Sequence, residues 1–184
     1  SAVEGEVYAL SSLFTAVVFW AIIKWESDAE SSHNLKWLVL IAYLMGLSIG
    51  VHLLNLLAIP AIVFVYYFKK FKPSLKGIVY AFGLSIFILA AIQYGIIPGA
   101  VIIASKFELL FTNSFGLPFN TGFLVYLSIL VGLVIFGLYK THVSRKVVLN
   151  TVILCFGAII LGYSSFAVIL IRSNADTPMD ENNP

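Results

Sequence analysis

The first residues suited to chemistry in this apolar chain are two carboxylates, Glu4 and Glu6, just before its first long apolar stretch. Carboxylates act as general acids or bases, and their hard oxygen ligands suit Mg²⁺ or Mn²⁺. The same residues also suit a solvated helix start, because acidic side chains favour the positive end of the helix dipole. The pair is therefore open to two interpretations: a site with Glu6 as base or metal ligand, and a plain helix terminus.

His52 and Asn55 form the second group, within the stretch GLSIGVHLLNLLAIP at residues 46–60. They are three residues apart and would share one face of a helix. Polar groups inside an apolar run are costly unless they face protein, water or a ligand. The pattern is consistent with a polar turn whose hydrogen bonds are satisfied inside a bundle, or with the edge of a functional pocket. We place the candidate pocket here.

Arg172 follows the last apolar stretch. Its side chain suits a membrane anchor that reaches the lipid headgroups, and equally a clamp for a phosphate, which matches the guanidinium geometry. We expect Gln93 and Tyr94 to line the same cavity as the residues above. Glu108, close to Lys106, is more typical of a helix lying at the membrane interface.

The composition indicates an integral membrane protein. Apolar residues make up 60% of the 184 residues, charged residues make up 11%, and the mean hydropathy is +1.00. A soluble domain carries about 25% charged residues. The sequence has no P-loop, GxGxxG, CxxC or HExxH motif, and its bases lie in short loops, so we expect no nucleic-acid partner.

The long apolar run Leu35–Phe68 decides the topology. It has 34 residues (68 − 35 + 1), so as one straight helix it would be about 51 Å long, whereas a bilayer core is about 30 Å thick. The run must therefore fold back, and the cluster of Gly46, Gly50, His52 and Asn55 is the place where we expect the turn.

We expect an all-α fold, a polytopic bundle of about six transmembrane helices plus one short interfacial helix at about residues 100–111. The transmembrane domain would occupy residues 1–172, followed by an extracytoplasmic tail at residues 173–184. Pro98 and Gly99 are expected to end the fourth span. The expected spans are residues 7–25, 35–50, 51–68, 77–97, 123–139 and 147–171.

Lysine and arginine placement indicates the orientation. With six spans, nine of the 11 bases fall on one side, which the positive-inside rule makes cytoplasmic. Both ends of the sequence would then be extracytoplasmic. Trp20, Trp25 and Trp37 are expected to be interface anchors. The nine bases are Lys24, Lys36, Lys69, Lys70, Lys72, Lys76, Lys140, Arg145 and Lys146.

Three stretches resemble a known family: EVYAL at residues 6–10, GLSIGVHLLNLLAIP at residues 46–60, and IRSNADTPMDENNP at residues 171–184. They are similar to large bacterial membrane proteins of formerly unknown function, common in the Bacteroidetes. Those proteins are related to the protein O-mannosyltransferases, which are membrane glycosyltransferases of the GT-C class.

The resemblance implies a GT-C-like helical fold with an outward-facing active site. It implies a sugar linked to a lipid phosphate as donor and a protein or glycan as acceptor. Glu6 and His52 would match catalytic positions at the pocket, while Arg172 would meet the lipid phosphate, assisted by Asn55 and Glu4. The first span and acidic loop of that class do not precede Glu4 here, so we expect a segment of a longer enzyme that is inactive by itself.

Two other functions fit the same composition. A transporter or flippase-like bundle would show broken helices and polar residues at the middle of the membrane. A membrane scaffold of a larger envelope complex would show no cavity where polar residues converge. The charges of this chain lie near the ends of the apolar stretches, which favours the transferase over an ion pathway.

Overall fold

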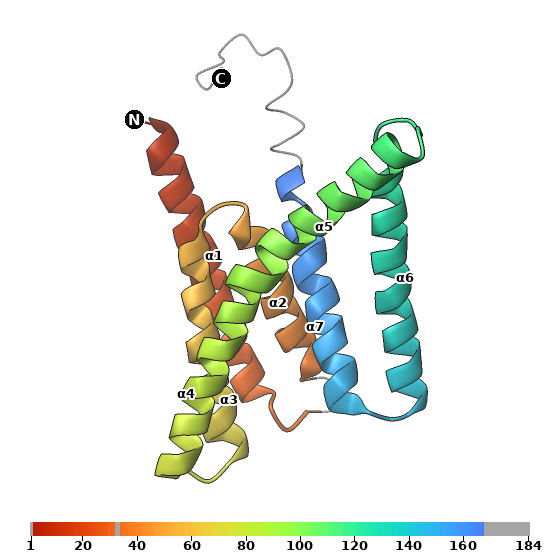
Figure 1. The fold of residues 1–184 in the computed structure, drawn as a ribbon. Helices are drawn as coiled ribbons and strands as arrows, with labels where there is room; N and C mark the ends of the chain where they lie inside the picture. Colours follow the sequence, from red (N-terminus) through yellow and green to blue (C-terminus); the bar gives the residue numbers. More distant parts are fainter. Residues whose placement is uncertain (1, 32–33, 168–184) are drawn as a thin grey trace.

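The computed structural model describes residues 2–31 and 34–167, with side chains described from Tyr8 onward except Leu54. The described residues form helices and turns without a strand, which confirms the all-α fold (Figure 1). The elements in chain order are α1 Ala2–Ser27, α2 Leu35–Ile49, η1 Leu53–Leu57, α3 Ala58–Lys70, α4 Leu75–Ala90, η2 Ala91–Ile96, α5 Ile97–Leu109, η3 Leu110–Ser114, α6 Thr121–Val143 and α7 Val147–Tyr163.

Three helical stretches are long and apolar enough to cross a membrane: Tyr8–Ser27, Leu75–Ser114 and Thr121–Val143. Leu35–Ile49 and Val147–Tyr163 are shorter apolar helices packed between them. About 20 apolar residues span a bilayer core, so this set confirms a helical membrane bundle. The expected last span runs to residue 171 and so extends beyond the described residues.

The expected reversal within Leu35–Phe68 is confirmed. α2 ends at Ile49, and the chain turns through Gly50 to His52 before the short 3₁₀ helix η1. The backbone N–H groups of Val51 and His52 both donate to the Ser48 carbonyl, at 3.0 and 2.8 Å. These bonds satisfy a carbonyl that the end of the helix would otherwise leave unpaired.

Gly46 is a helix-packing residue and does not belong to the turn in which we expected it from the sequence. It lies inside α2, where a Cβ atom would come within 2.3 Å of the Ile159 carbonyl oxygen of α7. From the other side, a Cβ on Gly162 would come within 2.5 Å of the Tyr43 carbonyl oxygen. Small residues let membrane helices approach backbone to backbone, so Gly46 and Gly162 fix the contact between α2 and α7.

The helix does not stop at Pro98 and Gly99 but continues from Leu75 to Ser114, and the expected end of the fourth span there stays a prediction. Pro98 lies in the first turn of α5, directly after the π-helical turn η2. Proline lacks an N–H group and crowds the preceding turn, and a widened π turn is one way for a helix to absorb this. The expected interfacial helix is therefore the continuation α5.

This helical stretch has 40 residues, or about 60 Å at 1.5 Å per residue, twice the thickness of a bilayer core. Part of it must therefore lie outside the hydrocarbon region. Figure 1 shows α5 running obliquely from the top of α4, past α7, to the start of α6.

The basic residues gather at one end of the bundle. The turns after α1, α3 and α6 lie there, whereas the start of α1, η1 and the turn before α6 lie at the other end (Figure 1). Lys70 ties α3 to the α1–α2 turn, because its Nζ donates to the Ala29 carbonyl at 2.7 Å and to Glu30 Oε1 at 3.1 Å.

Trp25 is 1% exposed and stacks on Tyr66, so it is a core residue and not the expected interface anchor.

Replacing Gly46 by Ala should destabilise the protein, since the added methyl group meets the α7 backbone and not a flexible side chain. We expect a loss of about 1–3 kcal/mol in the free energy of unfolding. Gly132→Ala is the control, because a Cβ there has no atom within 4 Å; its stability should stay within about 1 kcal/mol of the parent. Reversible unfolding in mixed micelles measures both. Equal stability of the two variants would show that the α2–α7 contact is not close.

Candidate functional site

A polar stripe on α1 faces the turn that follows α2. Tyr8, Ser11 and Thr15 are spaced three and four residues apart, which places them on one side of a helix. The Tyr8 ring lies beside the His52 ring, with centroids 6.0 Å apart, and Ser11 is buried at 8% exposure. Sequence reasoning missed this stripe, although its spacing within an apolar span was the signal that could have found it.

Asn55 fastens η1 to α1. Its side chain is 2% exposed, and Asn55 Oδ1 accepts a hydrogen bond from Thr15 Oγ1. Asn55 Nδ2 has no hydrogen-bond partner among the described residues, and the Thr15 hydroxyl also lies 3.0 Å from the Ser11 carbonyl. Turning the amide by 180° would let Nδ2 donate to Thr15 while Thr15 donates to Ser11, so that both the amide nitrogen and the hydroxyl would have a partner. Asn55 thus packs against α1, and its assignment to a phosphate stays a prediction.

His52 borders a pocket of about 510 Å³ between η1 and the helix formed by α4 and η2. Gln93 and Tyr94 line the same pocket, as expected from the sequence. The remaining walls are aliphatic, contributed by Leu53, Leu56, Leu57, Ile86, Leu89 and Ala90. A largely apolar pocket with a few converging polar groups is the usual form of a ligand site. An imidazole at its rim can act as a general acid or base.

The acidic candidates lie at the same end of the bundle. Glu4 and Glu6 belong to the first turns of α1, just before Tyr8, whose ring contacts His52. Their side chains and the whole of Arg172 lie outside the described residues. Among the described residues, no three His, Cys, Asp or Glu side chains gather to hold a metal. The assignment of a metal to Glu6 stays a prediction.

Glu108 has a structural role that its sequence context did not suggest. Its carboxylate accepts hydrogen bonds from the backbone N–H groups of Asn120, at 2.6 Å, and Phe123, at 2.9 Å. The first N–H group belongs to the N-cap residue Asn120 and the second to the first turn of α6, and such groups have no partner within the helix. A carboxylate there also complements the helix dipole. Glu108 therefore caps α6 from α5 and closes the α5–α6 hairpin.

The contact between Thr15 and Asn55 should couple α1 to η1. Thr15→Val leaves a buried amide without a partner, so we expect a loss of about 1–3 kcal/mol in stability. Asn55→Leu in the Thr15→Val background should cost less than Asn55→Leu alone, with a coupling energy of about 0.5–2 kcal/mol. Ser12→Ala is the matched control, since Ser12 is exposed and bonds only the Tyr8 carbonyl of its own helix. Additive effects of the two substitutions in unfolding measurements would contradict the contact.

In a comparison with known protein families, residues 1–76 match the family described as the protein O-mannosyl-transferase TMEM260 N-terminal domain. No curated protein and no solved structure matches the chain. The matched segment contains α1 with its polar stripe, the turn after α2, η1 and α3, and it ends at Lys76 in the first turn of α4. The chain is therefore similar, over the part that carries His52 and its α1 contacts, to the N-terminal domain of an O-mannosyltransferase family.

Proposed function

We propose that this chain is the membrane-embedded part of a GT-C-like glycosyltransferase that takes its sugar from a lipid-phosphate donor. The observation that carries the proposal is the match of residues 1–76 to the N-terminal domain of an O-mannosyltransferase family. The matched segment includes α1 and η1, which bring Tyr8 and Thr15 beside His52 and Asn55. The proposed site therefore lies at the η1 end of the bundle.

The chemistry of the transfer assigns roles to the residues at this end. The bond between the sugar and the lipid phosphate breaks, and a new bond forms from the sugar to a hydroxyl of the protein or glycan acceptor. Glu6, with His52 beside the pocket, would receive the proton of that hydroxyl. Arg172, assisted by Asn55 and Glu4, would stabilise the charge on the departing lipid phosphate, and Mg²⁺ or Mn²⁺ held by Glu6 is the alternative.

The structure offers less support for the two rival functions. An ion pathway needs charged groups at the middle of the membrane. Among the described residues, the lysines and acids lie towards the helix ends and turns, and α4 carries none after Lys76. A scaffold has no need of a pocket bordered by His52, Gln93 and Tyr94.

We propose that the end with the basic turns is cytoplasmic, following the positive-inside rule, and that the η1 end is extracytoplasmic. In a Cys155→Ala background, Asn113→Cys at the η1 end should react with a membrane-impermeant maleimide added to intact cells. Ser74→Cys at the basic end should react only after the cells are opened. The reverse pattern would invert the orientation and place the proposed site on the wrong side for an extracytoplasmic acceptor.

The activity test uses the protein in native membranes, with polyprenyl-phosphate mannose as donor and a Ser/Thr-rich peptide as acceptor. Glu6→Gln and His52→Ala should each lower the transfer rate about 10²–10⁴-fold, the usual contribution of a positioned base. Arg172→Ala should raise the donor KM, and Arg172→Lys should restore it in part, because lysine keeps the charge but loses the bidentate geometry.

His142→Gln is the control for this test, because His142 lies in the last turn of α6 at the basic end. It should transfer sugar at the parent rate. Full transfer by the combined Glu6→Gln and Arg172→Ala variant would remove the site assignment. Movement of the lipid-linked sugar across the membrane without transfer to the peptide would favour a flippase.

A further inference from the structure

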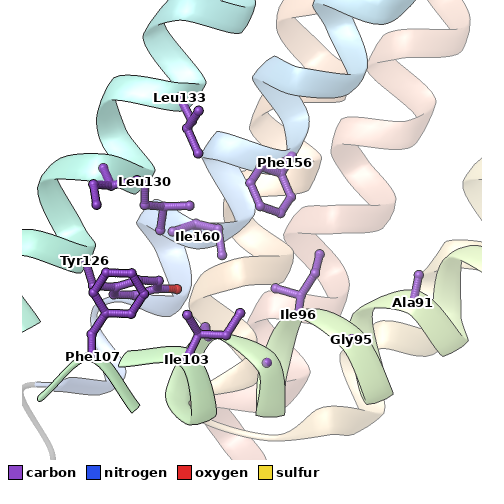
Figure 2. Close-up of a pocket in the computed structure, with 13 residues that line it drawn as sticks. Ala91, Gly95, Ile96, Ile103, Phe107, Tyr126, Leu130, Leu133, Phe156 and Ile160 are labelled. Carbon is purple, nitrogen blue, oxygen red and sulfur yellow. The ribbon is translucent and has the colours of Figure 1, made fainter. Parts of the chain in front are cut away.

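A second cavity lies on the opposite side of η2 from the His52 pocket. It has a volume of about 400 Å³ and is enclosed by η2 and α5, by α6, and by α7. Figure 2 shows Ile103 and Phe107 on one side, Leu130 on a second, and Phe156 and Ile160 on the third, all turned towards the same space. The His52 pocket and this cavity thus share the π-helical turn as a common wall.

The floor of the cavity is open because of two glycines. Gly95 and Gly99 are four residues apart, on one side of the helix, and both line the cavity. A Cβ atom on either would have no atom within 4 Å. These glycines are therefore not required by a close helix contact, in contrast to Gly46 and Gly162, and their effect is to leave space.

The walls of the cavity belong to segments suited to cross a membrane. η2 and α5 lie within the stretch Leu75–Ser114, and α6 is Thr121–Val143. Both stretches leave most of their apolar side chains exposed, including Ile129 and Leu133, which line the cavity and also face outward. In a membrane these surfaces are covered by lipid, so bilayer lipid has direct access to the cavity.

The cavity is too small to take in the whole of a further helix. A helix of ten residues is about 15 Å long and about 10 Å across, so it fills about 1,200 Å³. The cavity holds about a third of that. A single hydrocarbon chain is the apolar group of the bilayer that is thin enough to enter.

We propose that this cavity binds one fatty acyl chain of a bilayer phospholipid. The match in polarity identifies the occupant, since every lining residue is apolar apart from the Tyr126 hydroxyl. No charged side chain lines the cavity, so nothing there selects a lipid by its phosphate. The hydrocarbon chain that enters is then the one most abundant in the bilayer, which is the acyl chain of a phospholipid. Tyr126 turns its hydroxyl towards the cavity (Figure 2), where it can donate to the ester group of the lipid. The proposal does not depend on the proposed transferase function.

The test uses the full chain in phosphatidylcholine vesicles that contain a phosphatidylcholine with a diazirine on its acyl chain. After irradiation, mass spectrometry should find the lipid on Leu130, Phe156 and Ile160. Gly95→Leu and Gly99→Leu together fill the cavity and should lower this labelling about tenfold. Both variants should fold, because the space above each glycine is open and leucine favours helix more than glycine.

Gly83→Leu is the matched control. Gly83 also has no atom within 4 Å of an added Cβ, and it does not line the cavity, so labelling should be unchanged. Equal labelling of parent and filled variants would overturn the proposal, because the lipid would then be labelling the outer surface. Absence of labelling in the parent would overturn it too, in favour of a protein segment in the cavity. Labelling by a diazirine polyprenyl phosphate, but not by the phospholipid, would contradict the acyl assignment.

Discussion

The backbone contact between α2 and α7 is the constraint on which the rest of the structure depends. In a bilayer, helices gain little from burying apolar surface against one another, so close packing must hold them together. Gly46 and Gly162 provide this packing, since a side chain on either would collide with the opposite backbone. The contact joins the second and last described helices, and it holds the α6–α7 pair against the N-terminal half of the bundle.

The proposed site depends on the same contact. Because α2 is held by α7, its end at Ile49 is fixed, and the turn that follows delivers His52 and η1 to one end of the bundle. Asn55 then anchors η1 on Thr15, which leaves the His52 ring beside Tyr8 and at the rim of the pocket. On the far wall of that pocket, the π turn η2 carries Gln93 and Tyr94 to one side and Gly95 to the other. One irregular turn therefore separates the His52 pocket from the apolar cavity beside α6 and α7.

Features that depend on length and local composition could be predicted from the sequence. The reversal after α2 followed from a run too long for one span, and the sharing of a pocket by His52, Gln93 and Tyr94 followed from placing all three at one end. The stripe of Tyr8, Ser11 and Thr15 could equally have been predicted, because polar residues at helical spacing are a local signal.

Features that depend on partners distant in the sequence could not be predicted. Gly46 stood among turn-forming residues, and its true partner Ile159 is on another helix. Pro98 normally ends a helix, but here the π turn before it lets the helix continue. Trp25 and Glu108 are residue types that are common at the membrane interface. In the structure Trp25 is buried against Tyr66, and Glu108 caps the start of α6. Local sequence patterns predict helix ends and interface anchors, but contacts with residues distant in the sequence determine the actual role of each residue.

The most direct measurement of the central claim is an experimental structure of the full-length protein in a nanodisc with a bound, non-transferable polyprenyl-phosphate sugar analogue. If the chain serves a glycosyltransferase, the sugar and phosphate should lie at the η1 end, within contact distance of His52 and the start of α1. Density for the sugar at the end with the basic turns would contradict the claim. Absence of sugar density beside η1 at a saturating concentration of the donor analogue would contradict it as well.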